Sequence, residues 1–347
     1  MTFSNSLRRL SLLLLSFLLL ILLVSSFVSK SLYNYNNINI NRIRYDISLS
    51  AEPIGYVKPG VIDFPDDVGN EWELDCYSRP VLGDDGKKLW EVLVTDSKGK
   101  FRYIKTLPSN LVNSRNLRKV VEELIEDATV KPKIVRFFRN QMFNMITIAL
   151  STLDVEVKPS RRTNSLFMWL QEREQNIYPK MSGYDPKLRQ QTILDYDVSQ
   201  PDRLPDVFKA QSYAFVALPA ESFWNNEVNE ENIKLGHLAP IDGMPKTGWI
   251  HGIALFSKRA ESIAAWMNGL EIAFLKADLL GRELILNTDI STQFIVAPLM
   301  DAQKKEAQIF EKGKSTSEGY HFISVQEGPD SEEVEGFWLL RQFNDNL

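Results

Sequence analysis

The sequence has little cysteine and little histidine, the residues that cross-link a chain or bind transition metals. Its 347 residues include one cysteine, Cys76, and three histidines. A lone cysteine excludes a disulfide within the chain, and nothing in the sequence near Cys76 would lower the pKa of its thiol, so we expect a small buried side chain. His237, His251 and His321 lie far apart without the spacing of metal ligands, so we expect no metal site.

A glycine-rich phosphate loop is also missing, which leaves nucleotide hydrolysis without support. Glu71, Glu73 and Asp75 lie on one face of a predicted strand, and Glu91 lies on the next strand. A metal-dependent nuclease would also need a lysine two positions after such an acid, but a leucine stands two positions after Glu91. We therefore expect a protein that is not an enzyme and binds no cofactor. A nuclease that uses Glu73, Asp75 and Glu91 stays an alternative.

Residues 1–45 contain five basic residues and no acidic residue. Arg8 and Arg9 precede an apolar run of 15 residues (10–24), which small residues follow, as in a secretory signal peptide. The run is shorter than the roughly 20 residues that cross a bilayer as a helix, although an uncleaved membrane anchor is an alternative. Residues 28–45 have the composition of an organelle transit peptide. We expect residues 1–45 to be a bipartite leader that directs the protein to a plastid, and residues 46–70 to be an irregular entry arm.

The order of predicted strands and helices indicates an α/β (α+β) fold with mixed sheets in two domains. In the first domain, residues 71–177, we expect strands at 72–77, 89–94, 101–104, 134–138 and 155–157, and helices at 117–125, 142–153 and 164–175. Residues 178–210 contain four prolines and little periodicity, so we expect a linker. In the second domain, residues 211–343, we expect a polar excursion at 221–246 and a mixed sheet with packed helices. Its predicted strands are 213–218, 250–256, 284–286, 294–296, 321–325 and 336–340, and its helices are 261–276 and 302–312.

The charge is unevenly spread along the chain. Its 40 lysines and arginines oppose 45 acids, and without the leader the balance is 35 against 45, or about −10. The window 98–168 nevertheless contains 14 basic and six acidic residues, a surplus of about eight positive charges. Aromatic residues are interleaved with it: Phe101, Tyr103, Phe137, Phe138 and Trp169. Basic side chains neutralise phosphates and exposed rings stack on unpaired bases, so the window favours single-stranded RNA. The alternative is a solvated basic face above core aromatics.

Two strand–helix junctions in this window hold the candidate RNA-binding residues. We expect phosphate contacts from four arginines that flank the junctions, where free backbone N–H groups at a helix start also favour phosphate: Arg136, Arg139, Arg161 and Arg162. Asn140 and Gln141 lie at the first junction and could hydrogen-bond a base edge. The arginines could instead pair with structural carboxylates.

Several longer blocks of the sequence resemble one known family. They are Trp72–Pro80, Arg136–Ile146, Pro159–Thr163, Trp169–Glu174, Leu218–Ala220, Ala265–Glu271 and Gly336–Arg341. These blocks are similar to the plastid and cyanobacterial A/U-rich RNA-binding family that activates translation of photosystem mRNAs, and the resemblance covers roughly residues 70–343. It implies binding to A/U-rich 5′ untranslated RNA of photosystem I messages within a larger protein complex, and it supplies no residue-level RNA site.

We therefore expect a plastid stromal RNA-binding protein that activates translation of photosystem reaction-centre mRNAs. Its partners would be single-stranded A/U-rich RNA and proteins of a larger complex, and no membrane span is expected after the leader. The alternative is a protein-binding assembly factor for photosystems that makes no direct RNA contact.

Overall fold

The first three described strands form an antiparallel meander. In the computed structural model, which describes residues 59–60, 62, 64–188 and 200–343, β1 (Glu71–Leu82) pairs with β2 (Lys88–Asp96), which pairs with β3 (Arg102–Leu107). Gly86 and Gly99 adopt positive φ in the two turns, a conformation that costs glycine little. The predicted leader, residues 1–45, lies outside the described residues.

Two parallel strands extend this meander into a five-stranded sheet. β4 (Ile134–Phe137) pairs in parallel with β1 and with β5 (Glu156–Pro159), so the order is β3-β2-β1-β4-β5. We call this the N-terminal sheet. The parallel pairing brings the ends of β4 and β5, with the two predicted RNA-binding junctions, to one edge.

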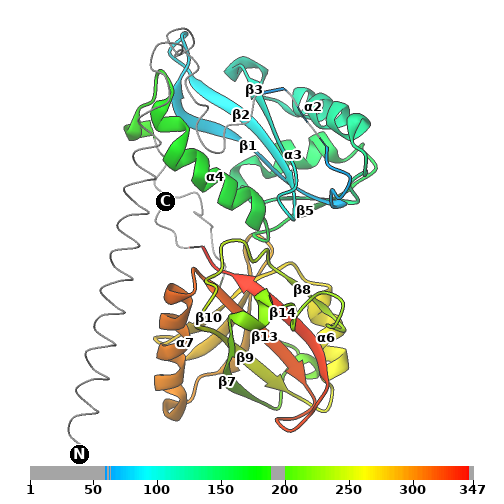
Figure 1. Cartoon of the computed structure of the whole chain (residues 1–347), viewed down its shortest axis with the longest axis vertical. Helices are drawn as coiled ribbons and strands as arrows, with labels where there is room; N and C mark the ends of the chain where they lie inside the picture. Colours follow the sequence, from blue (N-terminus) through cyan, green and yellow to red (C-terminus); the bar gives the residue numbers. More distant parts are fainter. Residues whose placement is uncertain (1–58, 61, 63, 189–199, 344–347) are drawn as a thin grey trace, which may run out of the picture. The chain divides into compact units, whose positions relative to one another are not determined.

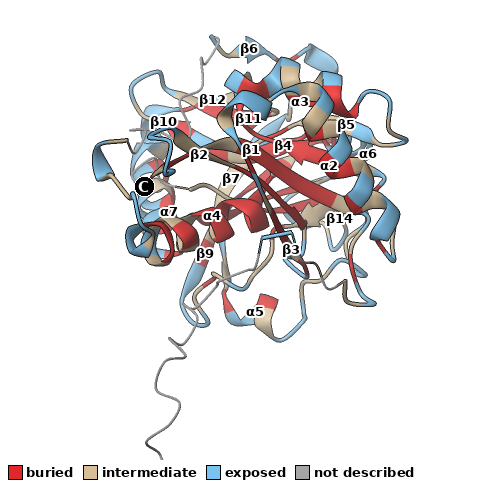
Figure 2. Cartoon of the chain, turned by 90° about the horizontal axis from the view of Figure 1, so that it is seen from above, coloured by how far each residue is buried: buried red, intermediate tan, exposed pale blue. Residues whose placement is uncertain are grey.

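Helices cover both faces of the N-terminal sheet (Figure 1). α2 (Ser114–Asp127) and α3 (Phe143–Leu150) pack on one face, where the buried side of α2 follows the helical period through Leu117, Val121 and Leu124. The Asn113 side chain caps α2 by accepting the N–H of Asn116 at 3.0 Å. α4 (Asn164–Asn176) packs on the other face. Buried positions therefore follow β1 and β4 on both sides (Figure 2).

The second half of the chain contains two sheets, where the sequence indicated one. The first has the order β7-β9-β13-β14-β8, and the second has the order β10-β11-β12-β6. α6 (Ala260–Asn268), α7 (Lys304–Thr316) and the second sheet pack on one face of the first sheet, while α5 (Glu221–Trp224) packs on the other. The strands are β6 (Asp202–Arg203), β7 (Ser212–Pro219), β8 (Gly236–Leu238), β9 (Trp249–Phe256), β10 (Ile272–Asp278), β11 (Glu283–Thr288), β12 (Thr292–Pro298), β13 (Tyr320–Gln326) and β14 (Val334–Arg341).

One predicted helix, 261–276, is wrong in its second half. α6 ends at Asn268, where the N–H of Gly269 bonds the carbonyl of Trp266, and β10 begins at Ile272. Ile272 and Leu275 are buried in the strand, and their i, i+3 spacing also fits a helix, so the apolar pattern alone did not reveal the stop at Gly269.

Two segments predicted as irregular contribute strands. The polar excursion 221–246 contains β8, which pairs in parallel with β14, and the predicted linker 178–210 contains β6, which pairs in parallel with β12. Strands of two or three residues are too short to show a periodic pattern. The boundaries of the predicted domains stay predictions.

The mixed α/β fold class is confirmed. Tertiary contacts join the described residues from Pro59 to Phe343 into one unit. Within this described part, no helix is both long enough and apolar enough to cross a membrane.

Candidate functional site

A layer of buried charges lies between the N-terminal sheet and α4. Strand alternation directs Asp75 of β1 toward α4, and its carboxylate accepts hydrogen bonds from two arginines. Arg139 donates from Nε at 2.6 Å, and Arg79 donates from Nη1 at 3.0 Å. Burial alone would raise the pKa of Asp75, but the two guanidinium groups outweigh it and hold the pKa below its usual value. Asp75 is therefore an ionised carboxylate that holds Arg139 in place.

Glu91 continues this layer on β2. Its carboxylate accepts Arg173 Nη2 at 2.6 Å, Arg79 Nε at 3.1 Å and the Tyr178 hydroxyl at 2.7 Å. Asp75 and Glu91 are thus enclosed by arginines, and within the described ranges no group of His, Cys, Asp and Glu is arranged to hold a metal. The layer offers no ligand set for the nuclease alternative.

Glu73 occupies a position that the sequence left open for phosphate. It is 2% exposed, and its Oε2 accepts the N–H of Leu166, in the first turn of α4, at 2.7 Å. A carboxylate of the chain itself therefore takes one of the free N–H groups at this helix start. Burial raises the pKa of Glu73 to about 8, because the carboxylate loses its water and gains few partners.

A second charge cluster joins the ends of β4 and β5 to the segment before β10. Arg136 binds Glu271 with two hydrogen bonds, from Nε at 2.7 Å and from Nη2 at 3.2 Å, and it binds Glu71 from Nη1 at 2.5 Å. The Ser160 hydroxyl donates to Glu271 at 2.9 Å, and Lys158 Nζ lies 3.6 Å from the same carboxylate. Glu271 is thus surrounded by the cationic groups of the cluster.

Arg162 completes this cluster. Its Nη2 donates to Glu71 at 3.3 Å, its Nε lies 3.8 Å from Glu271, and its Nη1 lies 3.4 Å from Nδ1 of His237 on β8. Burial would raise the pKa of Glu271, but Arg162 and Arg136 lower it to about 2. Burial, Arg162 and Arg136 together hold the pKa of His237 well below its usual value, so this imidazole is neutral. In both cases the nearby guanidinium groups favour the less positive form, which is the carboxylate of Glu271 and the neutral ring of His237.

The structure separates the six predicted contact residues into four places. Arg136 and Arg162 meet in the cluster around Glu271, whereas Arg139 lies in the layer under α4, where its guanidinium stacks 3.9 Å from the Tyr77 ring centroid. Arg161 donates from Nε to the carbonyl of Ile290 at 2.7 Å. Asn140 and Gln141 are exposed in a 3₁₀ turn, η2 (Asn140–Met142), before α3. Arg136 and Arg139 are 2% and 6% exposed, and both contact carboxylates of the fold, as the alternative of structural pairing predicts.

The five aromatic residues that the sequence associates with the basic window belong to the core. All five are at most 7% exposed: Phe101, Tyr103, Phe137, Phe138 and Trp169. The core alternative is therefore confirmed, and stacking on bases has no support from these rings. Cys76 is also buried, as expected, and burial raises the pKa of its thiol to about 12.

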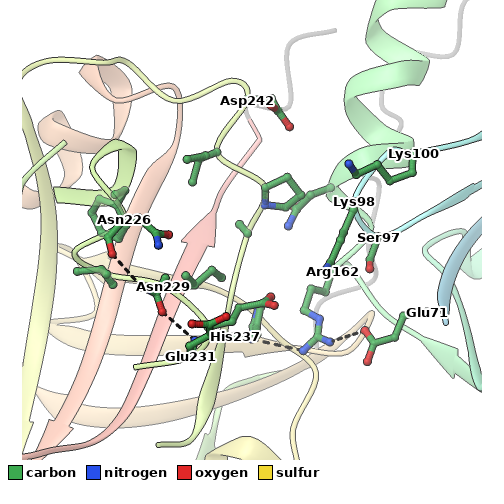
Figure 3. A pocket seen from close by; sticks show the side chains of 18 of the residues that line it. Glu71, Ser97, Lys98, Lys100, Arg162, Asn226, Asn229, Glu231, His237 and Asp242 are labelled. Carbon is green, nitrogen blue, oxygen red and sulfur yellow. Dashed lines mark hydrogen bonds and ion pairs between the residues drawn. The ribbon is translucent and has the colours of Figure 1, made fainter. Parts of the chain in front are cut away.

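Two adjoining hollows open beside Arg162. One has a volume of about 510 Å³ and the other of about 570 Å³. They share Glu71, Lys98, Arg162 and His237, and Lys158 and Lys234 line the second. Figure 3 shows the first, with Lys98, Lys100 and Arg162 on one side and the loop of α5 and β8 opposite. His237 could not be placed here from the sequence, because no pattern in residues 221–246 signals the short strand that carries it.

Comparisons with known proteins identify relatives of both halves of the chain. The family profile described as RNA-binding protein Tab2/Atab2 N terminal matches residues 71–173, and the profile of the Tab2/Atab2 C-terminal domain matches residues 191–341. Over 279 residues, the chain is 36% identical to the Arabidopsis thaliana protein named Protein TAB2 homolog, chloroplastic, an alignment that covers 78% of this chain and 74% of the relative. A Zea mays protein of the same name is 37% identical over 279 residues, covering 78% and 71%.

Proposed function

Since the chain belongs to the Tab2/Atab2 RNA-binding protein family, we propose that it is a plastid protein that activates translation of photosystem reaction-centre mRNAs. It would do so by binding A/U-rich, single-stranded RNA in their 5′ untranslated regions, together with protein partners. The match of both family profiles, one to each half of the chain, is the observation that carries this proposal. The chloroplastic relatives support the plastid location.

The charge clusters support an electrostatic mechanism. Arg162 lies at the hollows, where a phosphodiester could approach its guanidinium, and Lys98 adds a second cation beside it. Single-stranded RNA gains affinity when such cations replace the counterions of its phosphates. Arg136, Arg162 and Lys158 face three carboxylates, Glu71, Glu156 and Glu271, so the attraction of an anion to this region depends on Lys98, which forms no ion pair with a described residue.

The six residues predicted from the sequence have different parts in this proposal. Asn140 and Gln141 are exposed and can reach a base edge. Arg161 and Arg162 precede α4, and Arg162 lines the hollows. Arg136 and Arg139 act indirectly, since their guanidinium groups hold carboxylates within the fold. The roles in RNA binding are proposals for all six residues: Arg136, Arg139, Asn140, Gln141, Arg161 and Arg162.

Crosslinking in intact plastids tests the function directly. The protein is crosslinked to RNA by ultraviolet light, recovered, and the attached RNA is sequenced. We expect enrichment of the 5′ untranslated regions of photosystem reaction-centre mRNAs. RNA recovered in proportion to its abundance would contradict the proposed messages, and a chain that crosslinks to no RNA would favour the protein-binding assembly factor.

A further inference from the structure

We propose that the first hollow, beside Arg162, holds one unpaired nucleotide of a bound RNA strand. The phosphate of that nucleotide lies on the side of Lys98 and Arg162, and its base lies against amide and imidazole groups opposite. This inference rests on the proposed RNA binding and adds a site to it.

The size of the hollow suits a nucleotide. Its volume of about 510 Å³ falls within the range of about 300–1,000 Å³ that is usual for small-molecule sites. Part of its wall is apolar, from Val228, Pro240 and Ile241 in the segment between α5 and β9, which gives a base a surface to lie on. The second hollow shares residues with the first, so neighbouring nucleotides of the same strand have a path out past Lys158 and Lys234.

Polar side chains without partners line the hollow. The amide of Asn164, at the start of α4, is 7% exposed and makes no side-chain hydrogen bond to any described residue. Neither amide atom of Asn164 is among the fully buried, unpartnered side-chain atoms, so the amide is open to the hollow and available to a ligand. The Asn226 side chain also makes no hydrogen bond to a described residue, although it is exposed. Asn226 lies in the opposite wall and has a positive φ of 62°. The structure therefore keeps two amides free at a place where a base edge would use them.

His237 adds a third polar group. Its Nδ1 faces Arg162, which can only donate, so Nδ1 is the acceptor and the proton of the neutral ring is on Nε2. That N–H makes no hydrogen bond within the described part of the chain. Amides and a neutral imidazole donate and accept hydrogen bonds without net charge, which matches the Watson–Crick edge of an unpaired base.

The charges around the hollow orient the nucleotide. Lys98 lies in the turn between β2 and β3 and forms no ion pair with any described residue, while Lys100 pairs with the exposed Asp67 at 2.6 Å. Acidic side chains line the opposite side, among them Glu231 and Asp242 (Figure 3), whereas Glu71 on the near side pairs with Arg162. A phosphate is therefore attracted to the unpaired Lys98 and repelled from the opposite side, so the base points toward Asn226 and His237.

Two substitutions test the site without threatening the fold. Lys98→Gln removes the unpaired cation from an exposed turn, and Asn226→Gly removes an amide while keeping a backbone that tolerates positive φ. Lys119→Gln, on the exposed side of α2, is the matched control. Each protein is used as the full chain, its fold is checked by circular dichroism, and its affinity for a fluorescent A/U single-stranded RNA is measured. We expect each site variant to bind about tenfold more weakly, the loss expected for one phosphate or base contact, and the control to stay within about twofold of the original chain.

The outcomes separate the site from the function. If the original chain binds the RNA and both site variants bind equally well, the nucleotide site is wrong and the RNA-binding function stands. If the original chain does not bind, the proposed function itself fails. RNA that carries 4-thiouridine adds an independent readout, since we expect its crosslinks to map to residues 226–242. Crosslinks confined to the surface of α3 would overturn the site.

A free nucleotide could occupy the hollow in place of a nucleotide of an RNA strand. Titration with 5′-UMP distinguishes these two ligands, because a mononucleotide lacks the neighbouring phosphates that the second hollow would bind. We expect UMP to bind at least a hundredfold more weakly than the oligonucleotide. Binding of UMP as tight as that of RNA would assign the hollow to a free nucleotide and overturn the proposal.

Discussion

Arg136 binds Glu271 through two parallel hydrogen bonds, of 2.7 and 3.2 Å, although 135 positions separate the two residues in the chain. Fork-to-fork pairing of a guanidinium with a carboxylate is among the strongest polar contacts in proteins and fixes both side chains. The pair joins the end of β4 to the segment that leads into β10. It therefore sets the position of the cations that line the second hollow.

Removing the charge of Glu271 should destabilise the protein. Glu271→Gln leaves the guanidinium groups of Arg136 and Arg162 without their shared carboxylate, and a broken buried pair costs about 3–5 kcal/mol. We expect a loss of that order in the free energy of unfolding from urea titration. Glu261→Gln, on an exposed position of α6, should change it by less than about 0.5 kcal/mol. Equal effects of the two substitutions would contradict a structural role for the pair.

Asp75→Asn should be as damaging in the charge layer under α4. Arg79 and Arg139 would then be buried with one carboxylate fewer, and we expect about 3 kcal/mol or more to be lost from the free energy of unfolding. The control is Asp84→Asn in the exposed turn after β1. The same pair of variants tests the nuclease alternative. If Asp75 served catalysis, its substitution would abolish RNA cleavage in magnesium with little change in stability.

Glu73 should give the protein a stability that declines in alkaline solution. Burial raises its pKa from 4.5 to about 8, so the folded chain holds this proton more tightly than the unfolded chain. Its contribution is complete below about pH 4.5 and is lost as the pH rises through about 8, which amounts to roughly 2–3 kcal/mol between pH 6 and 9. Urea titrations across that range measure it.

Glu73→Gln keeps a neutral side chain that can still accept the N–H of Leu166, so this variant should lose most of the slope. Glu126→Gln, exposed on α2, should keep the slope of the original chain. A Glu73→Gln protein with an unchanged slope would show that another group is responsible.

Gly236 should be needed to present His237 to the hollows. It holds a φ of 131°, and a Cβ at this position would collide with the carbonyl oxygen of Phe337, the strand partner. We expect Gly236→Ala to lower the free energy of unfolding by more than about 2 kcal/mol and to weaken RNA binding. Gly328→Ala meets no atom within 4 Å and serves as the control. If Gly236→Ala folds and binds RNA normally, β8 does not position the site.

Periodic elements of the fold could be predicted from the sequence, because each of them buries enough side chains to leave a pattern. The alternation in β1 and the helical spacing in α2 are examples. The stop after α6 could not be predicted, because the i, i+3 spacing of Ile272 and Leu275 suits a helix as well as the strand they occupy. β8 is too short to leave any pattern, and the site depends on it.

The candidate site was predicted in part for the same reason. The basic window pointed to Arg162, but local sequence does not reveal which carboxylates a guanidinium will meet. Arg136 and Glu271 come together only through the tertiary fold. The aromatic residues show that neighbours in sequence can be separated by the fold. Phe137 lies beside Arg136 in the sequence, but it points to the opposite face of the strand and into the core.

The salt dependence of RNA binding tests the central claim most directly. The affinity of the full chain for A/U-rich single-stranded RNA is measured from 50 to 400 mM salt, for the original protein and for Lys98→Gln. Each phosphate contact contributes about −0.7 to the slope of log K against log salt for single strands. We expect a slope of about −2 or steeper for the original chain and a slope shallower by about 0.7 for the variant. No binding at 50 mM salt, or an affinity that does not change with salt, would contradict RNA binding through phosphate contacts.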